Sequence, residues 1–280
     1  MNTHHDRNIN PPIKDKLSLI YAFSLLIAIL MTVSSLAGLR YPTLIYPTDE
    51  LSRTFIPNDV VNIFIGLPIL LGSMWMAWRG KLMGLLCWPG ALFFVLYTYI
   101  AYIFAMPLNW AFLLHLALAT LSLYTLIGLV ASIDGKVVQQ TLSGAVPERF
   151  AGGVLVGLGF LFFLRVIGVM VNALTSGILP AETDLAVNIS DFLTTPAWVI
   201  GGILLWQKKE LGYVTGLGLL FQGSMLFIAL IIFLLLQPLL TSAPFAIAGV
   251  VVIFVMGLIC FIPFALFVRG VAARSKTLSE

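Results

Sequence analysis

The sequence predicts an all-α integral membrane protein with eight transmembrane helices, and two observations support this prediction. Of the 280 residues, 60% are hydrophobic and only 10% are charged, whereas soluble domains average about 45–50% apolar and about 25% charged residues. The apolar residues also gather in stretches as long as a bilayer-spanning helix, which needs roughly 20 residues. A transmembrane β-barrel does not fit, because its strands alternate apolar and polar residues and runs such as FIALIIFLLL at 227–236 do not.

The expected spans follow one another closely along the chain, so no separate soluble domain of typical size fits between them. The first has an apolar stretch from Leu17 to Leu39, longer than the about 7–15 apolar residues of a secretory signal peptide. We therefore expect it to remain as a helix, with no cleaved signal peptide. The eight expected spans are 17–39, 60–78, 82–104, 108–131, 150–173, 189–206, 211–235 and 244–268.

Lys and Arg residues are distributed unevenly between the two sides of this bundle. If the spans alternate in direction, the side of the N-terminus holds Arg7, Lys14, Lys16, Arg79, Lys81, Lys136, Arg149, Lys208, Lys209, Arg269, Arg274 and Lys276. The opposite side holds only Arg40 and Arg53. Positive residues mark cytoplasmic segments, which predicts a multi-pass protein of the cytoplasmic membrane with cytoplasmic tails at 1–16 and 269–280. The net charge of +3 is explained by this basic rim beside the lipid bilayer and requires no nucleic-acid partner.

The two halves of the chain resemble each other. LPILLGSMWMAWRGKLMG at 67–84 aligns with TPAWVIGGILLWQKKELG at 195–212. Pro68, Trp78, Lys81 and Gly84 match Pro196, Trp206, Lys209 and Gly212 at a constant offset of 128 residues. We expect two tandem four-helix repeats, 17–131 and 150–268, joined by a cytoplasmic linker at 132–149. An even number of spans per repeat makes the repeats parallel. The alternative is coincidence, since membrane segments draw on few residue types.

A charged side chain lies near the middle of the fifth expected span. Arg165 interrupts the apolar stretch FLFFLRVIGVMVNAL at 160–174. An arginine at the bilayer centre costs roughly 2.5–3.5 kcal/mol on insertion scales, so it usually faces the bundle interior or a wet cavity and finds a partner there. The expected partner is Asp191, which begins a polar stripe on the sixth span that also includes Thr194, Thr195 and Trp198.

Other polar residues are expected in the same outer half of the membrane. The candidate substrate-binding residues are Arg165, Asp191, His115, Asn62, Asp59, Arg40 and Gln222. Pro68 and Pro196 are candidate helix breaks, because proline removes a backbone donor; simple kinks are the alternative. Structural alternatives also apply to the candidate side chains. Asp59 and Arg40 would be solvated at the membrane surface, and His115 would be a hydrogen-bonded core histidine.

No motif in the sequence indicates an enzyme or a cofactor. H-E-x-x-H, the Walker loop and G-x-S-x-G are all missing. His115 is the only histidine outside the N-terminal tail, so we expect no metal site. Cys87 and Cys260 lie inside expected spans and form no C-x-x-C motif, which suggests small core side chains.

Three functions are compatible with these features. The first is a small transporter or permease with an outward-side polar cavity around Arg165 for a small anionic or polar substrate. The second is a non-catalytic membrane subunit or scaffold in which Arg165 and Asp191 form a structural ion pair. The third is a membrane-embedded enzyme that acts on lipid at the outer leaflet. A transporter of this size would be expected to form a homo-oligomer, and a scaffold would bind a partner subunit.

Overall fold

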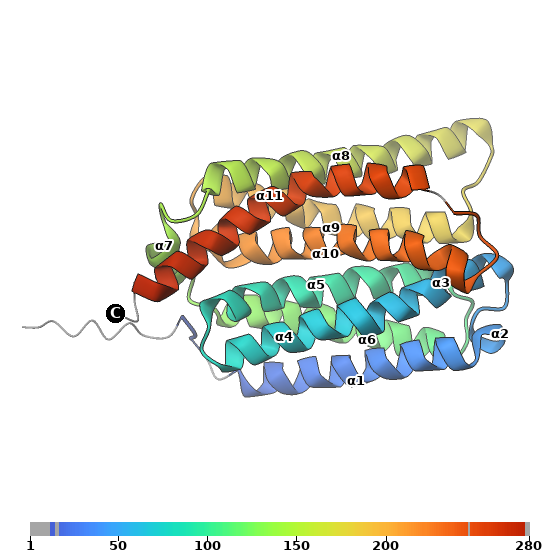
Figure 1. Cartoon of the computed structure of the whole chain (residues 1–280), viewed down its shortest axis with the longest axis horizontal. Helices are drawn as coiled ribbons and strands as arrows, with labels where there is room; N and C mark the ends of the chain where they lie inside the picture. Colours follow the sequence, from blue (N-terminus) through green and yellow to red (C-terminus); the bar gives the residue numbers. More distant parts are fainter. Residues whose placement is uncertain (1–11, 15–16, 246, 278–280) are drawn as a thin grey trace, which may run out of the picture.

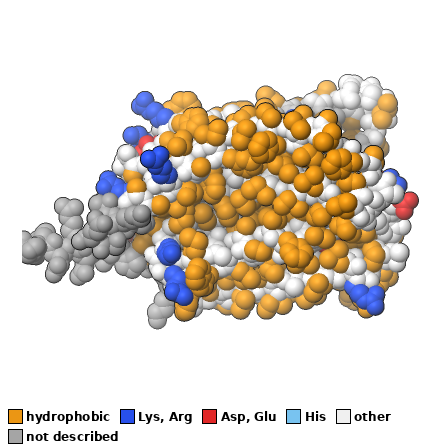
Figure 2. Space-filling model, in the orientation of Figure 1, with side chains coloured by type: hydrophobic (Ala, Val, Ile, Leu, Met, Phe, Trp, Pro, Cys, Tyr) orange, Lys and Arg blue, Asp and Glu red, His pale blue; other side chains and the backbone are white. Residues whose placement is uncertain are grey.

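The structure, a computed structural model, describes residues 12–14, 17–245 and 247–277 and contains no strand within these ranges (Figure 1). Its described part has eight helices long and apolar enough to cross a membrane, which confirms the predicted class and the multi-pass arrangement. Figure 2 shows hydrophobic side chains covering the flank of the bundle, as a lipid environment requires. Most of the 1–16 tail and residues 278–280 of the 269–280 tail lie outside the described residues.

The first half of the chain forms a bundle of four spans. Its helices are α1 (Ser18–Arg40), the short α2 (Pro42–Ile45), α3 (Asp49–Val61), α5 (Leu82–Ala105) and α6 (Trp110–Ser132), together with the π-helical segment η1 (Asn62–Gly66) and α4 (Leu67–Trp78), which continue α3 as one span. Both α1 and α5 pack against α4 and against α6. Most residues of α5 are buried, so this helix lies inside the molecule.

The second half also contains four spans, which follow a short connecting helix. Its elements are α7 (Gly135–Leu142), α8 (Glu148–Ser176), α9 (Glu182–Trp206), α10 (Glu210–Leu240) and α11 (Ile247–Thr277). Here α8 and α10 each pack against α9 and against α11. Helix α1 begins and α11 ends at the same end of the bundle, which we call the terminal end (Figure 1). Lys and Arg side chains gather mainly at this end on the face that Figure 2 shows.

Several helices extend beyond the apolar stretches that predicted them. The second span begins at Asp49 rather than at 60, because the Thr48 hydroxyl accepts a hydrogen bond from the Leu51 amide and caps the helix. Asp49 and Glu50 in its first turn also complement the helix dipole. The predicted 132–149 linker contains α7, which the Asp134 carboxylate caps in the same way.

Neither candidate helix break interrupts the chain. Helix α9 continues through Pro196, and Pro68 is the second residue of α4, which directly follows η1. In η1 the Leu67 amide bonds to the Asn62 carbonyl, five residues earlier. Such local π-helical adjustment is one way in which a membrane helix accommodates proline. The helix breaks considered at these positions are therefore replaced by a continuous helix at Pro196 and by one widened turn before Pro68.

The turns that join α4 to α5 and α9 to α10 share one geometry at the offset of 128 residues. Gly80 and Lys208 occupy equivalent left-handed positions, with φ of 72° and 57°. In the first turn, Gly80 N donates to Ala77 O (2.9 Å) and Lys81 N donates to Met76 O (3.0 Å). In the second turn, the equivalent hydrogen bonds run from Lys208 N to Leu205 O (2.9 Å) and from Lys209 N to Leu204 O (2.8 Å). This is the Schellman pattern of a helix C-terminus, which normally places glycine at the left-handed position.

The two halves meet where α5 crosses α10, and glycines make that contact possible. A Cβ atom added to Gly90 would collide with the backbone of Gly218, and one added to Gly218 would lie 3.0 Å from the Leu86 carbonyl oxygen. These two glycines are also 128 residues apart. Helix α5 additionally packs against α9, and α10 packs against α3. Small residues allow membrane helices to approach this closely.

The two equivalent turns should respond oppositely to substitution. Lys208→Gly removes the backbone strain of a lysine in the left-handed region and should raise the free energy of unfolding by up to about 1 kcal/mol. Gly80→Ala introduces the same strain and should lower the free energy of unfolding by about 1 kcal/mol. Equilibrium unfolding of both variants in mixed micelles measures this difference. Changes in the same direction would contradict the equivalence of the two turns.

The α5–α10 contact should be intolerant of a single methyl group. Gly90→Ala places a Cβ against the Gly218 backbone and should lower the free energy of unfolding by about 1–3 kcal/mol through overpacking. Gly72→Ala is the matched control, because Gly72 lies within α4 and nothing lies within 4 Å of an added Cβ. The melting temperatures of both variants in detergent test this prediction. An equal decrease in melting temperature for the two variants would show that the α5–α10 contact is loosely packed.

Candidate functional site

The close packing of α8 on α9 brings Arg165 to its expected partner. Arg165 Nη2 lies 3.0 Å from Asp191 Oδ2 and donates a second hydrogen bond of 3.1 Å to Asn188 Oδ1. Asn188 and Asp191 are three residues apart and therefore lie on one face of α9. On the opposite side of the carboxylate, the Tyr97 hydroxyl from α5 donates to Asp191 Oδ1 at 2.9 Å. Asp191 thus joins all three helices.

The two charges of this pair differ in exposure. The Asp191 side chain is 11% exposed, whereas the Arg165 side chain is 46% exposed. Both hydrogen bonds of Arg165 use Nη2, and its Nη1 and Nε atoms have no hydrogen-bond partner among the described residues. An arginine carries five N–H donors, so most of this guanidinium remains available to water or to a ligand.

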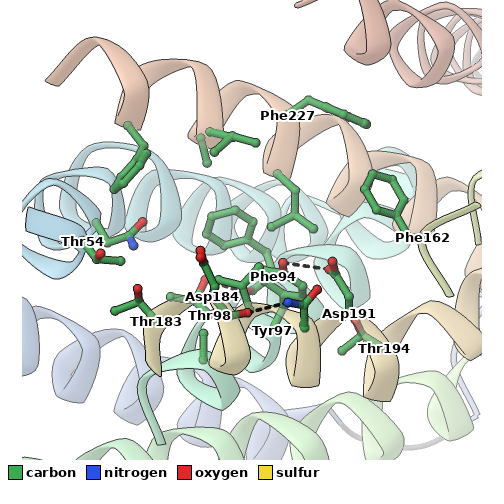
Figure 3. A pocket seen from close by; sticks show the side chains of 18 of the residues that line it. Thr54, Phe94, Tyr97, Thr98, Phe162, Thr183, Asp184, Asp191, Thr194 and Phe227 are labelled. Atoms are coloured by element: carbon green, nitrogen blue, oxygen red, sulfur yellow. Dashed lines mark hydrogen bonds between the residues drawn. The ribbon is translucent and has the colours of Figure 1, made fainter. Parts of the chain in front are cut away.

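Arg165 lines a cavity of about 750 Å³ between the two halves. This volume falls within the range of small-molecule sites, about 300–1,000 Å³. Figure 3 shows Asp184, Asp191 and Tyr97 along one side of the cavity, with Phe162 and Phe227 among the apolar side chains around the rest. The lining comes from α3, η1, α5, α8, α9, α10 and α11. The cavity therefore offers a polar side and an apolar side to one occupant.

A second polar cluster surrounds Asp59 beside this cavity. Asp59 is 0% exposed, so it is not solvated at the membrane surface. Its Oδ2 accepts a 2.5 Å hydrogen bond from the Tyr46 hydroxyl, and its Oδ1 accepts a 3.0 Å hydrogen bond from the Tyr102 hydroxyl. Asn62 Nδ2 donates to the same Tyr102 oxygen at 3.3 Å. Burial and the neighbouring carboxyl raise the pKa of Tyr46, which therefore stays a donor.

The remaining candidates have separate positions. His115 is a buried histidine whose Nε2 lies 3.0 Å from the Ser34 hydroxyl, and it does not line the cavity. Gln222 is also buried, and its Oε1 accepts a 2.7 Å hydrogen bond from Trp198, which does line the cavity. Arg40 is exposed at the end of α1, where its guanidinium lies over the Tyr41 ring.

Several residues of the site were not among the sequence candidates. From the sequence alone, Tyr97 and Tyr102 fit an interfacial aromatic belt, yet in the structure both bond to buried carboxylates. Their crowding on one apolar span was the available signal. Asn188 precedes Asp191 by about one helical turn and extends the polar stripe that was predicted to begin at Asp191. Tyr46 lies outside the long helices, where no periodic pattern reveals which way a side chain points.

The described residues contain no group of three or more His, Cys, Asp or Glu side chains that could hold a metal ion. Comparison with models of protein families, with curated proteins and with solved structures finds no match to this chain. Evidence on function therefore comes from the geometry of the site.

Neutralising Asp191 should destabilise the protein to a moderate extent. Asp191→Asn removes the counter-charge of Arg165, and we expect a loss of about 1–3 kcal/mol, below the cost of a fully enclosed pair because water reaches the guanidinium. Asp184→Asn is the control, because Asp184 is exposed on the same helix, and it should change stability by less than about 0.5 kcal/mol. Unfolding in mixed micelles distinguishes the two, and equal effects would contradict the assigned ion pair.

Proposed function

We propose that this protein is a small transporter, or permease, that binds a small polar solute in the cavity between its two halves. The observation that carries the proposal is the state of Arg165. Its guanidinium is about half exposed, lines the cavity and has unbonded donors, whereas a purely structural ion pair would be expected to enclose and saturate it. The apolar side chains opposite would contact the rest of the solute.

The charges of the lining narrow the class of solute. One guanidinium, Arg165, lines the cavity together with two carboxylates, Asp184 and Asp191. A simple anion would meet a lining with more negative than positive groups. The proposed solute therefore has a carboxylate-like or phosphate-like group for the free nitrogens of Arg165 and a neutral or cationic remainder. Zwitterions meet both requirements.

We propose further that the two halves are parallel repeats and that both termini are cytoplasmic. The matching helix contacts in each half, the matching turns at Gly80 and Lys208, and the Gly90–Gly218 contact support a twofold relation through the α5–α10 crossing. The concentration of Lys and Arg at the terminal end supports the orientation. Rocking of one repeat against the other would open the cavity to either side.

A membrane enzyme finds less support. His115, the acid–base group that such an enzyme would use, bonds within the core and does not line the cavity. Asp191 is already engaged by Arg165 and Tyr97. Among the described residues that line the cavity, Asp184 is the remaining carboxylate, and no histidine is present to share acid–base catalysis with it.

A thermal-shift screen in detergent tests the proposal. The panel contains amino acids, small mono- and dicarboxylates, and phosphate esters, and the proteins are wild type, Arg165→Gln and the control Arg40→Gln. A solute at about 100 times its Kd stabilises the folded state by about 2.7 kcal/mol. We expect a zwitterion to raise the melting temperature of wild type and Arg40→Gln but not of Arg165→Gln.

Two results would contradict this expectation. If no compound stabilises wild type and Arg165→Gln melts far below it, Arg165 is structural and the scaffold function is favoured. If simple anions stabilise wild type while zwitterions do not, a solute site exists but the charge argument is wrong.

A further inference from the structure

Asp59 is a buried acidic residue that has no part in the proposed binding of a solute at Arg165. Its side chain is fully buried, and the hydrogen bonds to its two oxygens come from neutral phenols, Tyr46 and Tyr102. In the described part of the chain, no Lys, Arg or His nitrogen lies within 4.0 Å of its carboxylate. A buried carboxylate without a positive partner is strongly disfavoured relative to its protonated form.

The packing around Asp59 closes it off from the side of α1. A Cβ atom added to Gly38 would collide with Asp59 Oδ2 and with the Tyr46 hydroxyl. The backbone of α1 therefore lies directly against the carboxyl group. This contact leaves no room for water between α1 and the carboxyl group. A proton would therefore reach Asp59 from the side of α5.

The α5 side of the cluster reaches the cavity. Tyr102 and Asn62 both line the cavity, whereas Asp59 does not. Asn62 bonds to Tyr102, and Tyr102 bonds to Asp59, so one phenol separates the carboxyl from the cavity. Asn62 also begins η1, and such single-turn π-helical segments occur frequently at functional sites.

The other titratable groups near Asp59 do not provide a counter-charge. Tyr46 and the α5 tyrosines Tyr99 and Tyr102 face it, and His115 from α6 packs against both α5 rings at centroid distances of 5.6 and 4.8 Å. The described residues offer no hydrogen-bond partner to His115 Nδ1 or to the Tyr99 hydroxyl. On α1, Ser35 faces the carboxyl, and Arg40 is exposed and engaged with Tyr41.

We propose that Asp59 is an exchangeable proton-binding site connected to the cavity through Tyr102. In the exchange step the carboxylate takes the hydroxyl proton of Tyr102, and the phenol oxygen takes a proton from a hydronium ion in the cavity, which becomes water. The phenol is regenerated and Asp59 is neutral. The role of this proton as the coupling ion of transport rests on the proposed function, whereas its binding at Asp59 does not.

Infrared spectroscopy of the protein in nanodiscs tests the site without a known solute. A protonated carboxyl group has a C=O stretching band that a carboxylate lacks, and isotope labelling of aspartate assigns it to that residue type. Asp59 and Asp191 are the buried aspartates among the described residues. We expect the band in wild type and in Asp191→Asn, and we expect Asp59→Asn to lose it.

The connection to the cavity is tested by the rate at which this band shifts after transfer to heavy water. Tyr102→Phe should slow the exchange roughly tenfold, the effect of losing one hydrogen bond of ordinary strength. Tyr99→Phe is the matched control, since Tyr99 is a buried phenol on the same helix with an unbonded hydroxyl, and it should exchange like wild type. His115→Gln should likewise keep both the band and its rate.

Several outcomes would overturn the proposal. Absence of a labelled aspartate band in wild type at every pH would show a permanently ionised carboxylate, and this result needs no variant to fold. A band that disappears when sodium replaces potassium would indicate a metal-cation site instead. Equal slowing by Tyr99→Phe and Tyr102→Phe would disprove the route. Failure of the solute screen leaves these readouts unchanged, so the two proposals fail separately.

Discussion

The packing of α5 against α10 at Gly90 and Gly218 is the constraint on which the rest of the structure depends. Without side chains at these positions the two backbones approach closely, and α5 becomes a helix shared by both halves. Two of its three tyrosines then bond to carboxylates in opposite halves of the molecule: Tyr97 bonds to Asp191 of the second half, and Tyr102 bonds to Asp59 of the first. One helix thereby connects the cavity, the ion pair and the uncompensated carboxyl.

The two acidic centres illustrate different ways of keeping a carboxyl group inside a membrane protein. Asp191 has a positive partner, Arg165, whose half-exposed guanidinium lines the cavity, so charge separation there is tolerated. Asp59 has only neutral donors and no exposure, so a proton is the simplest way to balance its charge. Under the proposed function, this asymmetry between the halves would separate a place for a polar solute from a place for a proton, as a coupled transporter requires.

Much of this architecture could be predicted from the sequence because the bilayer imposes strong rules. Apolar stretches identified all eight spans, and the cost of an isolated arginine in lipid pointed from Arg165 to Asp191. The helix ends were less predictable, since capping by Thr48 and Asp134 extends helices into polar segments. The roles of Tyr97 and Tyr102 could not be inferred, because tyrosines near a membrane surface fit an interfacial belt equally well. Pro68 and Pro196 predicted breaks that a continuous helix and one π-helical turn replace.

Water access to the cavity is the property that most directly separates a solute site from an enclosed ion pair. It can be measured as the labelling rate of Thr98→Cys, a cavity-lining position on α5, by a small charged thiol reagent in liposomes. The reference is Leu123→Cys on the exposed, lipid-facing surface of α6; wild type gives the background, since Cys87 and Cys260 are buried. A hydrated cavity predicts faster labelling at Thr98→Cys than at Leu123→Cys, because the reactive thiolate forms in water. Labelling of Thr98→Cys no faster than that of Leu123→Cys would show that water does not reach Arg165, and the pair would then be structural.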